Sequence, residues 1–253
     1  YQRSSHHPSL DLVTKLDPTQ ALYSTFKPRR LTAEELRDAM LIASGELNRE
    51  IGGLSARPDI NLEVARQPLQ IMGGSASVYE PDPTPEQRNR RSLYAEKLRG
   101  LRDPFFETFN QPGSTNSCEI RETSTVAPQA LTLINSQEMH DRALAFAHRL
   151  SKETQDDKQV IKRAFHLALG RAPTPKETLI FLEAWRTATS DESTLSPKES
   201  PLPNSIMRTV RAEKTGEFYT FKEFLPVSKL YKADLDRSQC NARIRGLSHL
   251  CLV

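Results

Sequence analysis

The sequence predicts a mainly α, irregular helical domain with long loops and a few short strands. Apolar residues recur at helical spacing in several segments, and capping signals precede most of these segments. Alternation typical of a strand or a loosely packed hairpin is confined to residues 218–231. The apolar fraction is only 37%, with 17 prolines against 10 glycines, which predicts a large share of exposed loop in a chain of 253 residues.

The first predicted helix follows a polar, proline-interrupted stretch at residues 1–28. Thr32 is placed to cap this helix, and Glu35 stands where a capping box requires an acidic residue. The apolar face comprises Leu36, Ala39, Met40, Ala43 and Leu47. Gly52-Gly53 ends the unit, and residues 52–87 form a connection so long that we expect a functional or mobile loop.

The first part of residues 88–109 fits either a strand or a short helix. Pro128 suits the first turn of a helix that runs to about Ile134. Asn135 and Glu138 then predict a second capped start. The buried face of the helix that follows comprises Met139, Ala143, Phe146, Ala147 and Leu150.

Two further helices are predicted downstream. The first spans residues 157–169 and ends at Gly170, where a left-handed C-cap is expected. Its face comprises Val160, Ile161, Ala164, Phe165 and Ala168. The second starts at the residues Thr174-Pro175-Lys176-Glu177, and its face comprises Leu179, Leu182, Trp185 and Ala188, with Phe181 beside it.

The helical period fails after residue 188, where Ser, Thr, Glu and Pro dominate. We therefore expect a mainly helical domain at residues 1–188, a divergent linker or insert at 189–241 and the start of a truncated C-terminal helix at 242–253. The chain opens at Tyr1 and stops within an apolar run, so both ends are expected to be cuts through a longer protein.

Charge and cysteine usage exclude several function classes. Lys+Arg 35 against Asp+Glu 32 leaves a net charge of +3 with the signs well mixed, so nucleic acid is not an expected partner. No apolar run reaches the roughly 18 residues of a membrane-spanning helix. The three cysteines show no Cys-x-x-Cys spacing, which excludes a zinc knuckle, a thioredoxin-like motif and haem attachment.

The histidines do not predict a metal site. The side chains of His6 and His7 diverge because the residues are adjacent, and His140 and His148 lie two helical turns apart. His166 is expected to be a half-buried helix residue. We therefore expect neither a metal nor a cofactor in this chain.

The most informative stretch runs from Asn116 to Asn135, where a polar loop leads into the Pro128 helix. Free N–H groups at a helix N-terminus favour anions, so a sulfate, carboxylate or phosphate of a sugar could bind there. The candidate ligand-binding residues are Arg91, Cys118, Arg121, Thr125 and Gln129. The alternative is structural: Ser124 or Thr125 caps the helix, and Arg121 meets an internal carboxylate.

Other polar and aromatic residues also have two readings. Cys118 fits a reactive thiol activated by Arg121, half of a disulfide, or a small buried residue. The arginines grip a phosphate, or they form a solvated face and salt bridges between helices; they are Arg29, Arg30, Arg88, Arg90 and Arg91. The aromatic residues stack on sugar rings or form a core; they are Tyr94, Phe105, Phe106 and Phe109.

A set of motifs carries a resemblance to a known family. In chain order they are YQRSS, DPTQALYSTFKPRRLTAEELRDAMLIASGELN, RRSLYAEKL, PFFETFNQPGSTNSCEIRETSTVAPQALTLINSQ and AFHLALGRAPTPKE, with an echo in the final GLSHLCLV. Over residues 1–187 the chain resembles a C-terminal domain of unknown function from large, exported planctomycete proteins. The resemblance implies an exported, periplasmic or cell-surface multi-domain parent, with upstream domains as partners. Those parents often include a cytochrome c-like domain, so a haem is expected only elsewhere in the parent.

Three functions remain in view, because no matched acid, base and nucleophile can be assigned. The first is an accessory or interaction module that binds an anionic or carbohydrate ligand. The second is part of a polysaccharide-acting enzyme whose site is shared with an upstream domain; its best local candidates are Glu119, Arg121, Glu122, His140 and Asp141. The third is a docking surface for the cytochrome c-like domain, near Phe105 and Phe109.

Overall fold

The fold is known from a computed structural model that describes residues 9–19, 21–22, 25, 29–65, 70–71, 74–75, 79–115, 117–198, 205–212, 214–224 and 230–252. The chain divides into two units, residues 1–32 and residues 33–253. In the first unit, helix α1 (Leu10–Leu16) ends at Asp17, whose carboxylate accepts hydrogen bonds from the backbone N–H groups of Ala21 and Leu22. The His6-His7 pair lies outside the described residues.

The second unit is mainly α, as predicted. Its helical elements are α2 (Ala33–Ser44), α3 (Leu62–Ala65), α4 (Pro85–Arg88), η1 (Ser92–Tyr94), α5 (Pro104–Thr108), α6 (Ala127–Asn135), α7 (Gln137–Glu153), α8 (Asp157–Leu169), α9 (Pro175–Ser193), η2 (Arg237–Gln239) and α10 (Ala242–Cys251). Its strands pair as two antiparallel hairpins, β1 (Gln70–Ile71) with β2 (Gly74–Ser75) and β3 (Ser205–Arg211) with β4 (Phe218–Phe224).

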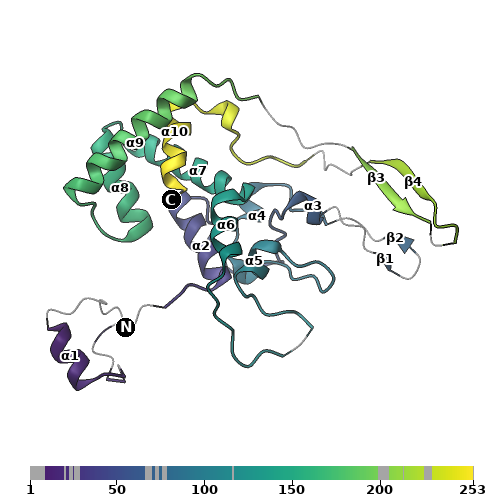
Figure 1. The fold of residues 1–253 in the computed structure, drawn as a ribbon, viewed down its shortest axis with the longest axis horizontal. Coiled ribbons are helices and arrows are strands. Elements are labelled where there is room, and N and C mark those ends of the chain that lie inside the picture. Colours follow the sequence, from purple (N-terminus) through teal and green to yellow (C-terminus); the bar gives the residue numbers. More distant parts are fainter. Residues whose placement is uncertain are drawn as a thin grey trace. The chain divides into compact units, whose positions relative to one another are not determined.

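The main hydrophobic core lies among the four C-terminal helices. The predicted face of α7 is buried throughout, from Met139 to Leu150. It packs with α8, α9 and α10 around a set of buried residues: Phe146, Ala147, Leu150, Val160, Ile161, Phe165, Leu182, Trp185 and Leu247. Helix α10 packs against both α7 and α9 (Figure 1). Helix α10 is therefore part of this core.

Helices α9 and α10 approach so closely that only glycine fits between them. A Cβ atom on Gly246 would stand 2.6–2.8 Å from atoms of Thr189, two of them backbone atoms. The pair is also joined by Glu192, a buried carboxylate on α9 that accepts hydrogen bonds from Arg237 at 2.5 Å and Arg245 at 2.8 Å. Packing and charge thus act together at this junction.

A second, smaller core confirms the structural reading for the phenylalanines Phe105, Phe106 and Phe109, whereas Tyr94 lies outside it. Phe105 and Phe106 are only 4% and 5% exposed, and they pack with Ala33 and Met139. The rings of Phe105 and Phe109 lie 5.0 Å apart. Phe105 and Phe106 therefore belong to a core and would not contribute to an exposed docking surface near Phe105 and Phe109, while Phe109 is partly buried.

Several local signals predict the structure correctly. Helix α8 spans the predicted residues, and Gly170 ends it with a φ of 68°. Thr174 caps α9 in a capping box with Glu177. Helix α6 has Pro128 in its first turn. Residues 218–224 form a strand, as the aromatic alternation indicates.

Other helix ends differ from the prediction. Helix α7 is capped by Ser136, not Asn135, because Ser136 has the extended backbone and its hydroxyl accepts a hydrogen bond from the N–H of Met139. Val126, and not Ser124 or Thr125, holds the N-cap position of α6, and its side chain makes no capping hydrogen bond. Helix α2 stops at Ser44, before Leu47, because the chain turns at Gly45 with a φ of 83°.

The predicted helix faces also include three errors: Ala39, Ala168 and Leu179 are exposed. The buried stripe of α2 instead runs through Ala33, Arg37, Leu41 and Ser44, and its position is set by a buried arginine that no apolar pattern reveals. Helix α9 also continues beyond Ala188 to Ser193. Residues 88–109 form short helices where the pattern left a strand open.

Candidate functional site

Arg121, the centre of the predicted ligand site, is already paired. Its Nη1 and Nη2 atoms lie 2.6 and 3.1 Å from the two carboxylate oxygens of Glu34 on α2. Gln111 donates a third hydrogen bond to the same carboxylate at 3.1 Å. Burial by itself raises the pKa of Glu34, but the hydrogen bonds from Arg121 and Gln111 outweigh it and hold the pKa at about 2. The structural reading, in which Arg121 meets an internal carboxylate, is confirmed.

Arg91, Thr125 and Gln129, three other predicted site residues, have surroundings of their own. Arg91 is half exposed and stands 4.0 Å from Asp38, one turn further along α2. Thr125 is exposed. Gln129 is buried, and its amide donates to the carbonyl of Thr108 at 3.1 Å and to Ser124 Oγ at 3.3 Å. The side chain of Gln129 therefore ties α6 to α5.

Cys118 is a free, exposed thiol whose Sγ lies 3.2 Å from the carbonyl oxygen of Ile120. The prediction of a small buried residue is therefore wrong. Cys240 and Cys251 are free as well. Within the described ranges, no three or more His, Cys, Asp or Glu side chains are grouped so that they could hold a metal ion.

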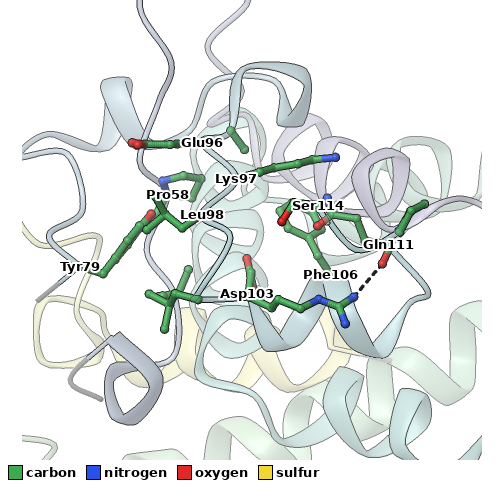
Figure 2. A pocket seen from close by; sticks show the side chains of 14 residues that line it. Pro58, Tyr79, Glu96, Lys97, Leu98, Asp103, Phe106, Gln111 and Ser114 are labelled. Atoms are coloured by element: carbon green, nitrogen blue, oxygen red, sulfur yellow. Dashed lines mark hydrogen bonds between the residues drawn. The ribbon is translucent and has the colours of Figure 1, made fainter. Parts of the chain in front are cut away.

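A small pocket lies beside α5, and none of the predicted site residues lines it, although two of its lining residues, Lys97 and Gln111, contact Glu34 (Figure 2). Its apolar wall includes the rings of Tyr79 and Phe106. Asp103, the N-cap residue of α5, lies at its base and accepts a hydrogen bond from the N–H of Phe105 at 2.9 Å. The hydroxyl of Tyr79 donates to the carbonyl of Pro58 at 2.6 Å, which fixes the ring.

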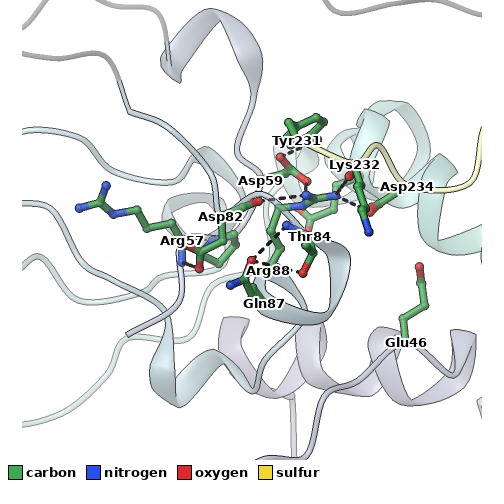
Figure 3. Close-up of polar contacts among 12 residues, drawn as sticks. Glu46, Arg57, Asp59, Asp82, Thr84, Gln87, Arg88, Tyr231, Lys232 and Asp234 are labelled. Atoms are coloured by element: carbon green, nitrogen blue, oxygen red, sulfur yellow. Dashed lines mark hydrogen bonds and ion pairs between the residues drawn. The ribbon is translucent and has the colours of Figure 1, made fainter. Parts of the chain in front are cut away.

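The most elaborate polar arrangement is a buried cluster around Arg88, which is 1% exposed (Figure 3). Its Nε atom lies 2.5 Å from Asp59 and its Nη2 atom 2.8 Å from Asp234. It also donates to the carbonyl oxygens of Asp82 and Lys232, and it stacks on the ring of Tyr231 at 4.4 Å. Arg88 therefore holds the segment around residue 232 against the α4 region.

Arg142 on α7 extends this cluster. It pairs with the second oxygen of Asp234 and lies 2.7 Å from Glu46. Burial raises the pKa of Glu46 and Asp59, although each carboxylate faces an arginine. The carboxylates are thus crowded into a site with too few cations to offset their burial.

Asp103 and Glu138 are the least compensated carboxyl groups. The nearest guanidinium, Arg37, gives its Nη hydrogen bonds to the carbonyls of Arg88 and Arg90 and to Ser92 Oγ, and its Nε atom lies 3.9 Å from Glu138. Burial, followed by repulsion from Asp103, raises the pKa of Glu138 to about 7. Burial likewise raises the pKa of Asp103. One proton can therefore be held between these groups near neutral pH.

Apolar side chains are exposed on a loop that hydrogen bonds hold rigid. The Arg90 guanidinium donates to the carbonyls of Glu50, Gly52 and Leu54 and stacks on the Tyr94 ring at 4.1 Å. Residues 50–54, named here the apolar loop, turn at Gly52 and Gly53 with φ values of 85° and 81°. Its side chains Ile51 and Leu54 are 83% and 88% exposed.

Sequence reasoning missed the residues that matter most in these sites. Asp103 followed by Pro104 is an N-cap signal with proline at the first helical position, and it could have located α5. Thr84 and Gln87 form a capping box that could have located α4 and hence Arg88. Asp234 had no such local signal, because its partner Arg88 lies 146 residues away.

Comparison with known proteins gives one match. The family model PSD1, described as "Protein of unknown function (DUF1553)", matches residues 1–185. No curated protein and no solved structure matches the chain. None of the helices in the described part of the chain combines the length and the apolar character needed to cross a bilayer.

Proposed function

We propose that this chain, which belongs to the PSD1 family of proteins of unknown function, is an accessory interaction module of a larger exported protein. The apolar loop is the observation that carries this proposal. Large aliphatic side chains scattered singly over a surface need no explanation. Two exposed aliphatic side chains on one ordered loop need an explanation. The hydrogen bonds from Arg90 fix the loop backbone but do not shield the side chains of Ile51 and Leu54 from solvent.

Two effects favour the binding of a partner to this loop. The partner buries aliphatic surface, and it meets a loop whose conformation is already fixed, so little entropy is lost on binding. Leu93, 74% exposed, belongs to the same area, since Tyr94 accepts a hydrogen bond from the N–H of Gly52 and the carbonyl of Tyr94 binds the N–H of Ala56. The partners we propose are the upstream domains of the parent protein.

Isothermal titration of the chain with the separately produced remainder of its parent tests this proposal. The double variant Ile51→Asp/Leu54→Asp should bind at least about tenfold more weakly, since charged groups at a desolvated contact cost more than 1.4 kcal/mol. The matched control is Leu179→Asp/Ile180→Asp, which changes two exposed aliphatic residues of α9 and should bind as the wild type does. Equal binding by both double variants, or none by the wild type, contradicts the proposal.

An anionic or carbohydrate ligand at the loop before Pro128 is a second, weaker proposal. Such a ligand competes with Glu34 for Arg121, so binding should be weak at neutral pH. Thermal-shift titration with sulfated and plain glycans tests this. A stabilisation that disappears in Arg121→Ala supports the proposal, and an unchanged midpoint up to millimolar glycan contradicts it.

A further inference from the structure

The pocket at Asp103 has a size that restricts what can enter it. Its volume is about 40 Å³. On this measure roughly 10–15 Å³ is enough to hold one water molecule, so the pocket has room for a small terminal group of a ligand. A ligand can therefore place only a small terminal group in the pocket, with the rest of it outside.

The charged residues of the pocket indicate which charge the bound group carries. Asp103 supplies a carboxyl group to the lining, and repulsion from Asp103 contributes to the raised pKa of a second carboxyl group, Glu138 of α7. Arg37 of α2 gives its Nη hydrogen bonds to the carbonyls of Arg88 and Arg90 and to Ser92 Oγ, while its Nε atom lies 3.9 Å from Glu138. Among the described residues, the carboxylate of Asp103 accepts a hydrogen bond from the N–H of Phe105 but forms no salt bridge.

The walls favour the same kind of group. Tyr79 and Phe106 place aromatic rings around the space, on either side of Asp103 (Figure 2). Aromatic faces attract cations through the ring quadrupole, and a carboxylate beside them adds a charge-assisted hydrogen bond. We propose that this pocket binds a small organic cation, the ammonium head of a primary amine, between Tyr79, Phe106 and Asp103.

The other charged groups of the pocket are already engaged or stand at its rim. Arg102 pairs with Glu107 at 2.6 Å and donates to the carbonyl of Gln111, and Glu96 pairs with Arg57. Lys97 is half exposed and lies 4.0 Å from Glu34. Its ammonium group repels a bound amine, so Lys97 weakens binding but does not block the pocket.

Proton linkage gives a second signature. Burial raises the pKa of Asp103, and the groups that face it are Glu138 and Arg37 from the interior and Tyr79, Lys97 and Arg102 from the rim. An ammonium group replaces the proton held by the carboxyl pair. Binding should therefore release a proton and become tighter as the pH rises from 6 to 8.

The experiment is isothermal titration of the full chain with n-butylammonium chloride at pH 6 and pH 8. The neutral probe n-butanol and the anionic probe butyrate are titrated in parallel. We expect butylammonium to bind, at least threefold more tightly at pH 8, while the other two probes bind at least tenfold more weakly. Comparable binding of butanol, tighter binding of butyrate, or no binding of butylammonium to the folded chain overturns the proposal.

Three variants locate the site. Asp103→Asn should weaken butylammonium binding at least tenfold and abolish the pH dependence, while asparagine still caps α5. Asp156→Asn is the matched control, because Asp156 caps α8 in the same way through the N–H of Gln159. Lys97→Met should strengthen binding several-fold. An Asp103→Asn variant that binds butylammonium as the wild type does refutes the assignment, whatever the fate of the proposed docking at the apolar loop.

Discussion

Glu34 on α2 and Glu138 on α7 each face an arginine, yet their carboxyl groups behave in opposite ways. Arg121 meets Glu34 through two short contacts, and the pKa of Glu34 falls to about 2. Arg37 stands 3.9 Å from Glu138 and gives its Nη hydrogen bonds to other acceptors, and the pKa of Glu138 rises to about 7. The two carboxylates do not differ much in exposure, since the Glu34 side chain is 18% and the Glu138 side chain 29% exposed; the pairs differ in how closely the arginine approaches and in the burial of the arginine itself.

The contrast shows that the position of a carboxylate in the sequence does not predict whether its ionised form is stabilised in the fold. A guanidinium that reaches both oxygens of a carboxylate stabilises the ionised form. A guanidinium committed to backbone carbonyls leaves a buried carboxylate to bear its own desolvation. The chain thus uses arginine for two purposes, to pair charges and to tie backbone segments together.

The largest effect is expected where a buried charge has complete partners. Asp234→Ala removes the carboxylate shared by Arg88 and Arg142, which are both buried. Breaking such a pair should destabilise the second unit by about 3–5 kcal/mol. Urea unfolding followed by circular dichroism measures this, with Asp191→Ala, an exposed acidic residue of α9, as the control. A loss below about 1 kcal/mol would break the distinction between interior and surface pairs.

A substitution that changes no charge, Gly246→Ala, gives a reference for the size of these losses in the free energy of unfolding. Gly246→Ala puts a methyl group within 2.6–2.8 Å of atoms of Thr189, so α9 and α10 must move apart. We expect a loss of about 1–3 kcal/mol in the free energy of unfolding, the usual cost of overpacking. Ser248→Ala, a buried neighbour on the same helix, separates this effect from a general sensitivity of α10. A Gly246→Ala variant as stable as the wild type would mean that the two helices have room to spare.

The pH dependence sharpens the comparison because the two glutamates act over different ranges. Glu138 has a raised pKa, so its stabilising contribution is full below pH 4.5 and is lost as the pH rises through about 7. Glu34 has a lowered pKa, so its contribution is present above pH 4.5 and is lost as the pH falls towards 2. The unfolding free energy should therefore be highest near pH 5.

Glu138→Gln isolates the interior half of this dependence. Between pH 5 and pH 8 the wild type should lose on the order of 1–2 kcal/mol, and the variant should lose much less. Urea titrations at the two pH values measure the difference. A variant that keeps the full dependence would assign it to other buried carboxylates, such as Asp59 or Glu46, whose pKa values are also raised.

The smallest effect is expected at the surface pair. Arg121→Ala removes a contact that is 42% exposed on the arginine side, and solvent screens it. The loss should stay below about 1 kcal/mol and should shrink further in high salt. Arg163→Ala, another exposed arginine paired with a glutamate, provides the reference. A loss as large as that of Asp234→Ala would place the loop before Pro128 among the core elements.

The elements that sequence predicts well are those whose signals are local. The face of α7, both ends of α8 and the capping box at Thr174 each follow from residues within a few turns of one another. The loop before Pro128 was misleading for the same reason: Arg121 and Gln129 are close in sequence, but Arg121 binds Glu34 and Gln129 binds Thr108 and Ser124. The partner of Arg121 lies 87 residues away on α2.

The interior polar groups lay beyond prediction because their burial depends on topology. Arg88 stands in a run of arginines that reads as a solvated surface, and only the packing of α4 against residues 231–234 buries it. The pocket likewise joins Tyr79 to Asp103 and Phe106, which follow different segments. Neither arrangement has a sequence period of its own.

Residues 231–245 contact α4, α7 and α9 again after the β3–β4 hairpin, and these contacts bear on how such proteins can diversify. Arg237 and Arg245 bind Glu192 on α9, and Asp234 binds Arg88 and Arg142, so both ends of the intervening excursion are anchored on one body. The entropy of closing a loop grows only slowly with its length, by about 0.6 kcal/mol per doubling. Residues 196–229 are therefore a natural point of insertion, where a lineage or an engineer can exchange the β3–β4 hairpin for another module at little thermodynamic cost.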